Sequence, residues 1–191
     1  MQSKILSKQT LLLIIVLSGL ILLIENAATI PNGEQTNSRL PPLLIGAPGR
    51  LKIPSINVDA PVEYVGLTSD GAMDVPKVPA NVAWFNQGPR PGENGSAVIA
   101  GHYGWKNNIP AAFDTIHTLR KGDKIYIEDE NGVNTVFVVR EIQIYSKNED
   151  APLVFGSSDG KAHLNLITCT GVWNKAEKTY SDRLIVFTDK E

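Results

Sequence analysis

The sequence predicts an all-β domain, either a barrel or a sandwich, preceded by an N-terminal helix that anchors it to a membrane. Three observations support this: eight short apolar segments, turn residues between them, and one uncharged apolar stretch near the N-terminus. We therefore divide the chain into an anchor over residues 1–25, a linker over residues 26–49 and a folded domain over residues 50–191.

The anchor is centred on Leu11 to Ile24, which is 14 residues long and uncharged. As a helix it would measure about 21 Å, short of the roughly 30 Å bilayer core. The 20 residues from Ile5 to Ile24 suffice if the side chain of Lys8 reaches the interface. Lys4 and Lys8 predict a cytoplasmic N-terminus and an extracellular domain, in a single-pass protein of the cell membrane. The alternative is a cleaved signal peptide, which would leave the domain secreted.

The linker, Asn26 to Gly49, contains four prolines and three glycines and shows no apolar period, as is typical of a tether. The folded domain follows it as a series of strands, and Ile125 and Ile127 alternate with polar neighbours as in a half-buried strand. Ala111 to Leu119 is the one predicted helix. The predicted strands are Arg50–Ile53, Val62–Tyr64, Val82–Phe85, Ser96–His102, Lys124–Glu128, Thr135–Tyr145, His163–Cys169 and Arg183–Thr188.

Composition and charge argue against several classes of function. The net charge of −2 gives no basic surface for nucleic acid, so we predict no nucleic-acid partner. A single cysteine excludes an internal disulfide, and the three histidines do not occur at metal-ligand spacing. We predict neither a metal nor a cofactor.

The single cysteine, Cys169, ends an apolar run, where it is either a buried small side chain or a nucleophile. Arg183 begins the next strand. If these strands pair antiparallel, Cys169 lies beside Arg183, Ile167 faces Ile185 and Asn165 faces Phe187. Alternatively, Arg183 merely caps its strand or pairs with Asp182.

Of the three histidines, His102 is the candidate partner of Cys169. It ends the apolar run Ser96–Gly101, so its ring lies at the rim of a sheet, although a surface histidine in a turn is an equal alternative. His163 lies about 20 Å from Cys169 along one strand and cannot contact it. His117 falls within the predicted helix and is expected to be a packed or capping residue.

These residues resemble the sortase family pattern: a histidine after an apolar strand, a Leu-x-Thr-Cys segment and an arginine opening the last strand. In this chain they are His102, Leu166–Cys169 and Arg183. Arg50–Val62 is similar to the first two sortase strands. Gly71–Pro76 and Gly88–Glu93 are most similar to class F sortases.

The resemblance implies a closed barrel of about eight strands with one or two short helices. It implies a cysteine transpeptidase in which His102, Cys169 and Arg183 are catalytic. Such enzymes cleave an LPxTG-like sorting signal between Thr and Gly and pass the acyl group to an amine of the cell wall or a pilin. The Thr170 N–H is expected to stabilise the oxyanion.

Two alternatives stay open at this stage. One is a secreted thiol peptidase that hydrolyses the same kind of peptide. The other is a tethered β-domain that binds peptides or wall polymer without catalysis. Trp173 and Tyr180 either line the peptide groove or pack against it.

Overall fold

The computed structural model describes residues 45–104 and 109–191. The predicted anchor and residues 26–44 of the predicted linker lie outside these ranges. Within them, no helix is long and apolar enough to cross a bilayer. The elements are β1 (Pro48–Ile53), η1 (Pro54–Ile56), β2 (Val58–Val65), β3 (Val82–Phe85), β4 (Gly95–Gly101), η3 (Ile116–Thr118), β5 (Lys124–Asp129), β6 (Asn134–Ser146), α1 (Pro152–Phe155), β7 (Ala162–Asn174) and β8 (Thr179–Lys190).

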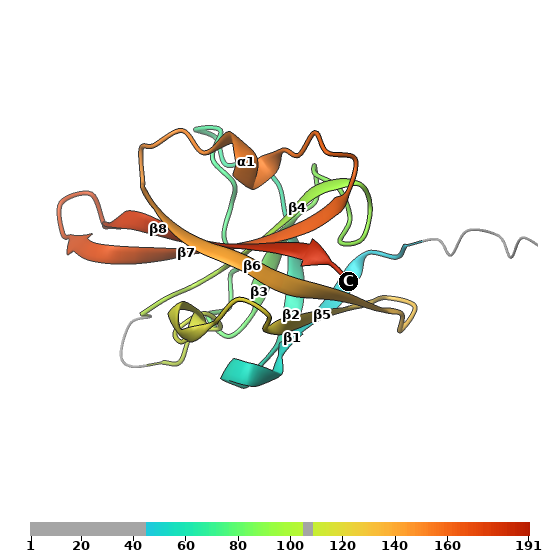
Figure 1. Ribbon diagram of the computed structural model, residues 1–191. Helices are drawn as coiled ribbons and strands as arrows, with labels where there is room; N and C mark the ends of the chain where they lie inside the picture. The colour runs from blue at the N-terminus through green and yellow to red at the C-terminus, as the bar shows by residue number, and fades with distance from the viewer. Residues whose placement is uncertain (1–44, 105–108) are drawn as a thin grey trace, which may run out of the picture. The chain divides into compact units, whose positions relative to one another are not determined.

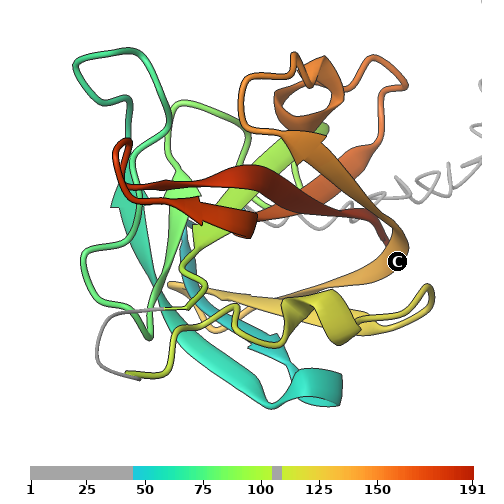
Figure 2. The ribbon, with the colours of Figure 1, turned by 90° about the vertical axis from the view of Figure 1, so that its left-hand side faces the viewer.

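The eight strands close into a barrel in the order β1-β2-β3-β4-β7-β8-β6-β5. Most neighbours pair antiparallel, but β2 pairs with β3 and β4 with β7 in parallel. Figures 1 and 2 show the strands wrapping around a common interior, with α1 outside the barrel above β7 and β8. The prediction of a closed barrel of about eight strands with little helix is confirmed.

Two apolar layers lie on opposite sides of the barrel wall. The larger fills the interior and includes Leu51, Phe137 and Leu166, all fully buried. The smaller covers the outside of β4, β7 and β8, where Val98 and Ile185 pack under Val154 of α1 and its neighbours. The second layer matters for function, because it forms the floor of the cavity described below.

All eight predicted strands are present, but several are longer than predicted. β7 runs past Cys169 to Asn174, and β8 already begins at Thr179, so the two form a long hairpin. The pairing of Trp173 with Tyr180 explains the extension, since their rings meet edge to face at 5.1 Å across the hairpin.

The predicted helix over Ala111–Leu119 is wrong. This segment forms turns that end in η3, a single 3₁₀ turn. The Asp114 carboxylate accepts the N–H groups of Ala111 and Gly104, and the Phe113 N–H bonds to the carbonyl of His102. These local bonds compete with an α-helical hydrogen-bond pattern.

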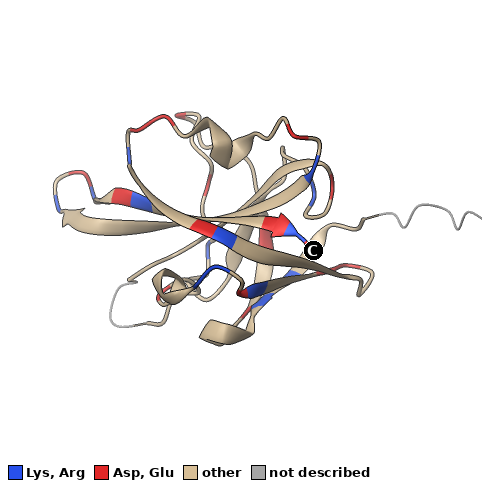
Figure 3. Cartoon of the chain, viewed as in Figure 1, with Lys and Arg blue, Asp and Glu red and all other residues tan. Residues whose placement is uncertain are grey.

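Acidic and basic residues are interspersed along the described strands and loops (Figure 3). Several pair across neighbouring strands, such as Lys52 with Glu128 at 2.7 Å and Arg140 with Asp189 at 2.6 Å. Because these side chains are substantially exposed, each pair contributes at most about 1 kcal/mol.

Candidate active site

Three adjacent strands bring His102, Cys169 and Arg183 to one level of the sheet. In the antiparallel β7–β8 pair, Cys169 lies opposite Arg183, as predicted. In the parallel β4–β7 pair, the last partners are Ala100 and Ile167. The same register, continued two residues, places His102 level with Cys169. Neighbouring strands are about 4.8 Å apart, so the three backbones lie side by side.

The side chain of Cys169 lies on the outer face of the barrel. Along β7, Leu164, Leu166 and Thr168 are buried toward the interior, while Ile167 packs in the outer layer. Cys169 alternates with Thr168 and is half-buried on the outer face. The Thr168 hydroxyl donates to the carbonyl of Gly101 at 2.8 Å, which ties β7 to β4 just before the two candidate catalytic residues.

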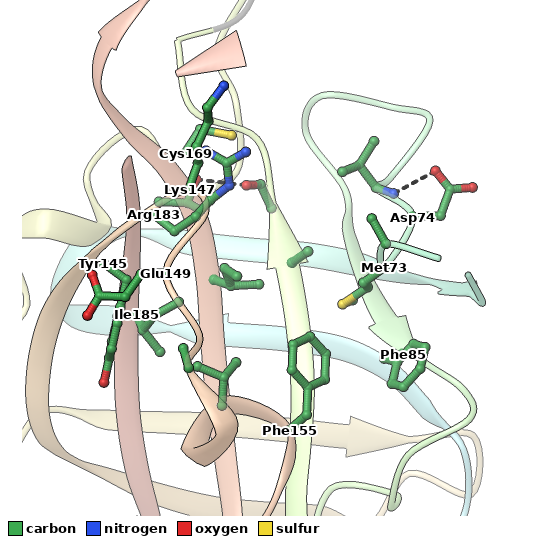
Figure 4. A pocket seen from close by; sticks show the side chains of 18 of the residues that line it. Met73, Asp74, Phe85, Tyr145, Lys147, Glu149, Phe155, Cys169, Arg183 and Ile185 are labelled. Carbon is green, nitrogen blue, oxygen red and sulfur yellow. Dashed lines mark hydrogen bonds between the residues drawn. The ribbon is translucent and has the colours of Figure 1, made fainter. Parts of the chain in front are cut away.

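A cavity of about 690 Å³ lies on this outer face and is lined by His102, Cys169 and Arg183. The β2–β3 loop forms one wall and the β6–β7 loop with α1 forms the other. Figure 4 shows Arg183 beside Cys169 at one end, with apolar side chains further along. The lining residues from the walls and floor include Met73, Phe85, Tyr145, Phe155 and Ile185.

His102 is held at both its backbone and its ring. Its carbonyl accepts the Phe113 N–H at 3.1 Å, and its Nε2 bonds to the carbonyl oxygen of Pro76 at 2.7 Å. Gly101 is required beside it, because a Cβ there would overlap the Phe113 ring. The glycine at the end of the apolar run Ser96–Gly101 therefore leaves room for the Phe113 ring, which packs in the barrel interior next to His102.

Directly after Cys169 the hairpin is interrupted by a bulge between Thr170 and Trp173. Gly171 has a φ of 85°, which favours glycine, and a Cβ there would overlap Ser181 and Asp182. The Ser181 hydroxyl accepts the Val172 N–H at 2.9 Å. The bulge therefore fixes the backbone that follows the thiol.

Arg183 is held by β8 rather than by an acidic residue. Its guanidinium donates to the carbonyls of Tyr180 and Asp182, at 3.2 and 2.9 Å, and to the Thr179 hydroxyl at 3.2 Å. In the described part of the chain it forms no ion pair, and the Asp182 carboxylate instead accepts from Ser181. The alternative of an Asp182 ion pair is thus not observed.

A family model of the sortase domain matches residues 51–191, most of the chain and nearly all of the barrel. The chain belongs to the sortase family. Members of this family are cysteine transpeptidases. A comparison with curated proteins found no match.

Solved sortase structures share the fold of this sortase. Sortase C-1 from Actinomyces oris is 26% identical with a TM-score of 0.59, over 74% of this chain and 72% of that one. A sortase D5 transpeptidase from Clostridium perfringens is 27% identical with a TM-score of 0.56, over 76% and 79%. Sortase A from Corynebacterium diphtheriae is 22% identical with a TM-score of 0.58, over 76% and 60%, a likeness of fold alone. The similarity to class F stays a prediction.

The other two histidines lie outside the cavity of this sortase. His117 is exposed in the last turn of η3, so it is not a packed residue, and its position agrees with the capping alternative. His163, six residues before Cys169 on β7, is buried, and its ring bonds to Asp159 and Asp189. No group of three His, Cys, Asp or Glu residues in the described ranges has the geometry of a metal site.

Trp173 and Tyr180 pack against each other instead of lining the cavity, and Tyr103 meets Tyr180 edge to face at 5.8 Å. Burial, and then the neighbouring Tyr103, Cys169 and Asp114, raise the pKa of the Tyr180 hydroxyl.

The cavity walls were missed by sequence reasoning. The Met73 and Phe85 side chains come from a loop and a strand end with no catalytic signature, and α1 is only four residues long. The apolar run Leu153–Phe155 between Pro152 and Gly156 was the one available signal for α1.

Proposed function

We propose that this sortase cleaves an LPxTG-like sorting signal between Thr and Gly through a thioacyl-enzyme on Cys169. The acyl group then passes to an amine of the cell wall or a pilin. The observation that carries this proposal is the alignment of His102, directly after β4, with Cys169 on β7 and Arg183 on β8 in a single cavity.

In the first half-reaction, the Cys169 thiolate attacks the Thr carbonyl carbon, and a thioester forms as the Thr–Gly bond breaks. His102, as an imidazolium, gives its proton to the departing glycine amine. In the second half-reaction, the neutral ring takes a proton from the incoming amine as that nitrogen attacks the thioester.

The negative charge on the carbonyl oxygen needs donors at the position where it develops. Arg183 supplies one, because its guanidinium carries five N–H donors and stays protonated throughout. The Thr170 N–H, in the backbone held by the bulge, supplies the second. Donors of this kind contribute roughly 3–4 kcal/mol each to catalysis.

The rest of the cavity suits an extended peptide with apolar residues before the scissile bond. Its floor is apolar, and Met73, Phe85 and Phe155 line the cavity together with the charged wall residues Asp74, Lys147, Glu149 and Asp150. A volume of about 690 Å³ exceeds what a single side chain requires and fits several residues.

For the whole protein, the proposal includes the predicted anchor. With residues 1–25 in the membrane and the N-terminus cytoplasmic, the barrel acts at the outer cell surface, where sorting signals and wall amines meet. N-terminal sequencing of the mature protein tests this part, since a start near Thr29 would indicate a cleaved signal peptide and a secreted enzyme.

Incubation with a library of LPxTG-like peptides and an added amine, analysed by mass spectrometry, tests the reaction. Amide products with the amine are expected, and they must be lost in Cys169→Ala. Products of hydrolysis alone, at every amine concentration, would favour a thiol peptidase. Intact peptides throughout would contradict both.

A further inference from the structure

The contact between His102 and the β2–β3 loop has a direct chemical consequence. A carbonyl oxygen only accepts, so the hydrogen bond to Pro76 requires a proton on Nε2 of the imidazole. In the neutral ring, Nδ1 is then the proton acceptor. The Pro76 carbonyl therefore favours the tautomer of the proposed acid and base in which Nε2 carries the proton.

The part of the β2–β3 loop around Pro76 makes few apolar contacts. Pro76 is buried, but Val75 and Val78 on either side are 50% and 48% exposed. One further backbone contact, from the Ala112 N–H to the carbonyl of Pro79 at 2.9 Å, ties the loop to the segment after His102.

The main polar contact comes from Glu63 on the outer face of β2. Its carboxylate accepts the N–H groups of Lys77 and Val78, at 2.9 and 3.2 Å, and the side-chain amide of Asn81 at 2.9 Å. Desolvation opposes the charge on Glu63, but these three donors outweigh it and lower the pKa of the carboxyl below its ordinary value. One ionised side chain thus binds three donors in the five residues after Pro76.

We propose that Glu63 is a positioning residue, which holds the Lys77–Asn81 segment so that the Pro76 carbonyl orients the imidazole of His102. The link runs from β2 through the loop to the ring, and Glu63 does not line the cavity. The inference rests on the proposed role of His102 in acid–base catalysis.

The first half of the same loop is held independently. Leu67 bridges to Met73, the Asp74 N–H bonds to the carbonyl of Gly66 at 3.0 Å, and the Thr68 N–H bonds to that of Ala72 at 2.8 Å. These residues include those that form the cavity wall. Loss of the Glu63 carboxylate should therefore have a larger effect on the orientation of His102 than on the affinity for substrate.

The test begins with Glu63→Gln, which keeps the shape of the side chain. One of its two terminal atoms becomes an NH₂ group, which then faces a donor of the loop. Asp59→Asn is the matched control, because it removes a carboxylate from the same strand that bonds to Arg50 instead of the loop. Asn81→Ala is a milder second variant if Glu63→Gln folds poorly.

The first measurement needs no substrate. Nitrogen NMR of the three imidazoles, at about pH 8 where ordinary histidine is neutral, should show a proton on Nε2 of His102 in the parent protein. Glu63→Gln should give a mixture of tautomers, while the signals of His117 and His163 stay unchanged. An unaltered His102 signal in Glu63→Gln and Asn81→Ala, or an equal change in Asp59→Asn, would overturn the inference.

The second measurement is the rate of acylation by an LPxTG-like peptide across pH. We expect kcat to fall by up to about 100-fold in Glu63→Gln, as for a modest misplacement of a catalytic group, with an altered pH profile and little change in KM. A rise in KM alone would contradict the inference. If the parent protein acylates no peptide, the proposed function fails, whereas the tautomer measurement still decides the role of Glu63.

Discussion

The floor and the walls of the cavity are built from different kinds of contact. The floor is a continuous sheet, in which backbone pairing between β4, β7 and β8 sets the positions of His102, Cys169 and Arg183. The walls are loops, held by local backbone bonds and by a few charged or amide side chains. The residues proposed for chemistry therefore stand on or directly beside paired strands, whereas the walls that contact the rest of the peptide are formed by loops.

The two walls differ in turn. In the β2–β3 loop, Glu63 holds the segment that follows the cavity wall through backbone N–H groups. In the β6–β7 wall, Asn165 donates to the carbonyls of Leu153 and Val154, at 3.2 and 2.7 Å. The His163 ring lies between Asp189 at 2.9 Å and Asp159 at 3.0 Å and bonds to both.

The largest effect is expected at the centre of the floor. Cys169→Ala removes the only thiol in the chain, so no covalent acyl-enzyme can form. Intact-mass spectrometry with an LPxTG-like peptide should show a mass increase in the parent protein and none in the variant. Turnover by Cys169→Ala would contradict the nucleophile assignment, and failure of thiol reagents to label the folded parent would favour a structural cysteine.

His102→Ala should lower kcat/KM by about 10²–10⁴-fold, the usual contribution of general acid–base catalysis. The fold should persist, because His102 follows the last residue of β4 and is only half-buried. His117→Ala is the matched control, since His117 is exposed and does not line the cavity. Equal losses in the two variants, or a lower thermal stability in His102→Ala alone, would indicate a structural role.

Arg183→Lys keeps the positive charge at this position but not the planar geometry of the guanidinium. Lysine lacks the planar fork that reaches two β8 carbonyls and an oxyanion together. We expect kcat to fall by about 10²–10³-fold, as when one oxyanion donor is lost. Arg50→Lys, on β1, should have no effect on the rate. Normal turnover by Arg183→Lys would make Arg183 a structural residue.

The floor was predictable from the sequence because strand pairing follows simple rules. Alternation and one turn were enough to predict that Cys169 faces Arg183, and the predicted Ile167–Ile185 and Asn165–Phe187 pairs are also confirmed. If β7 slipped by one residue against β8, Leu166 would move to the outer face and Cys169 to the barrel interior. The apolar pattern of β7 therefore disfavours every register shifted by one residue.

The walls were not predictable in the same way. Their contacts join residues such as Glu63 and Lys77 through side chain and backbone, with no period that the sequence reveals. The wrong helix at Ala111–Leu119 has the same origin. Its spacing of Phe113 and Ile116 fits both a helix and a series of turns, and the carboxylate of Asp114 favours the turns.

The smallest effect should come from the β6–β7 wall. Asp159 accepts from the Lys161 N–H, from His163 and from the Ser157 hydroxyl, and these donors lower the pKa of its carboxyl well below 3.8. A carboxyl with a lower pKa in the folded state stabilises that state above its unfolded pKa, about 3.9, and the stabilisation is lost as pH falls through the folded value. Asp159→Asn should therefore lower Tm at pH 7 by roughly 2–4 °C.

The pH dependence separates this contact from a nonspecific effect of charge. The Tm difference between the parent protein and Asp159→Asn should shrink as pH falls below about 4, because the carboxyl of the unfolded parent then takes up a proton, and it should vanish once pH falls below the lower pKa of the folded parent. Asp150→Asn removes a charge from the same loop but leaves the His163 bonds intact. This variant should show neither the lower Tm at pH 7 nor the pH-dependent difference in Tm. If the two walls act as proposed, Asp159→Asn raises KM severalfold at unchanged kcat, the reverse of Glu63→Gln. The same kinetic change from both variants would mean that the walls move as one unit.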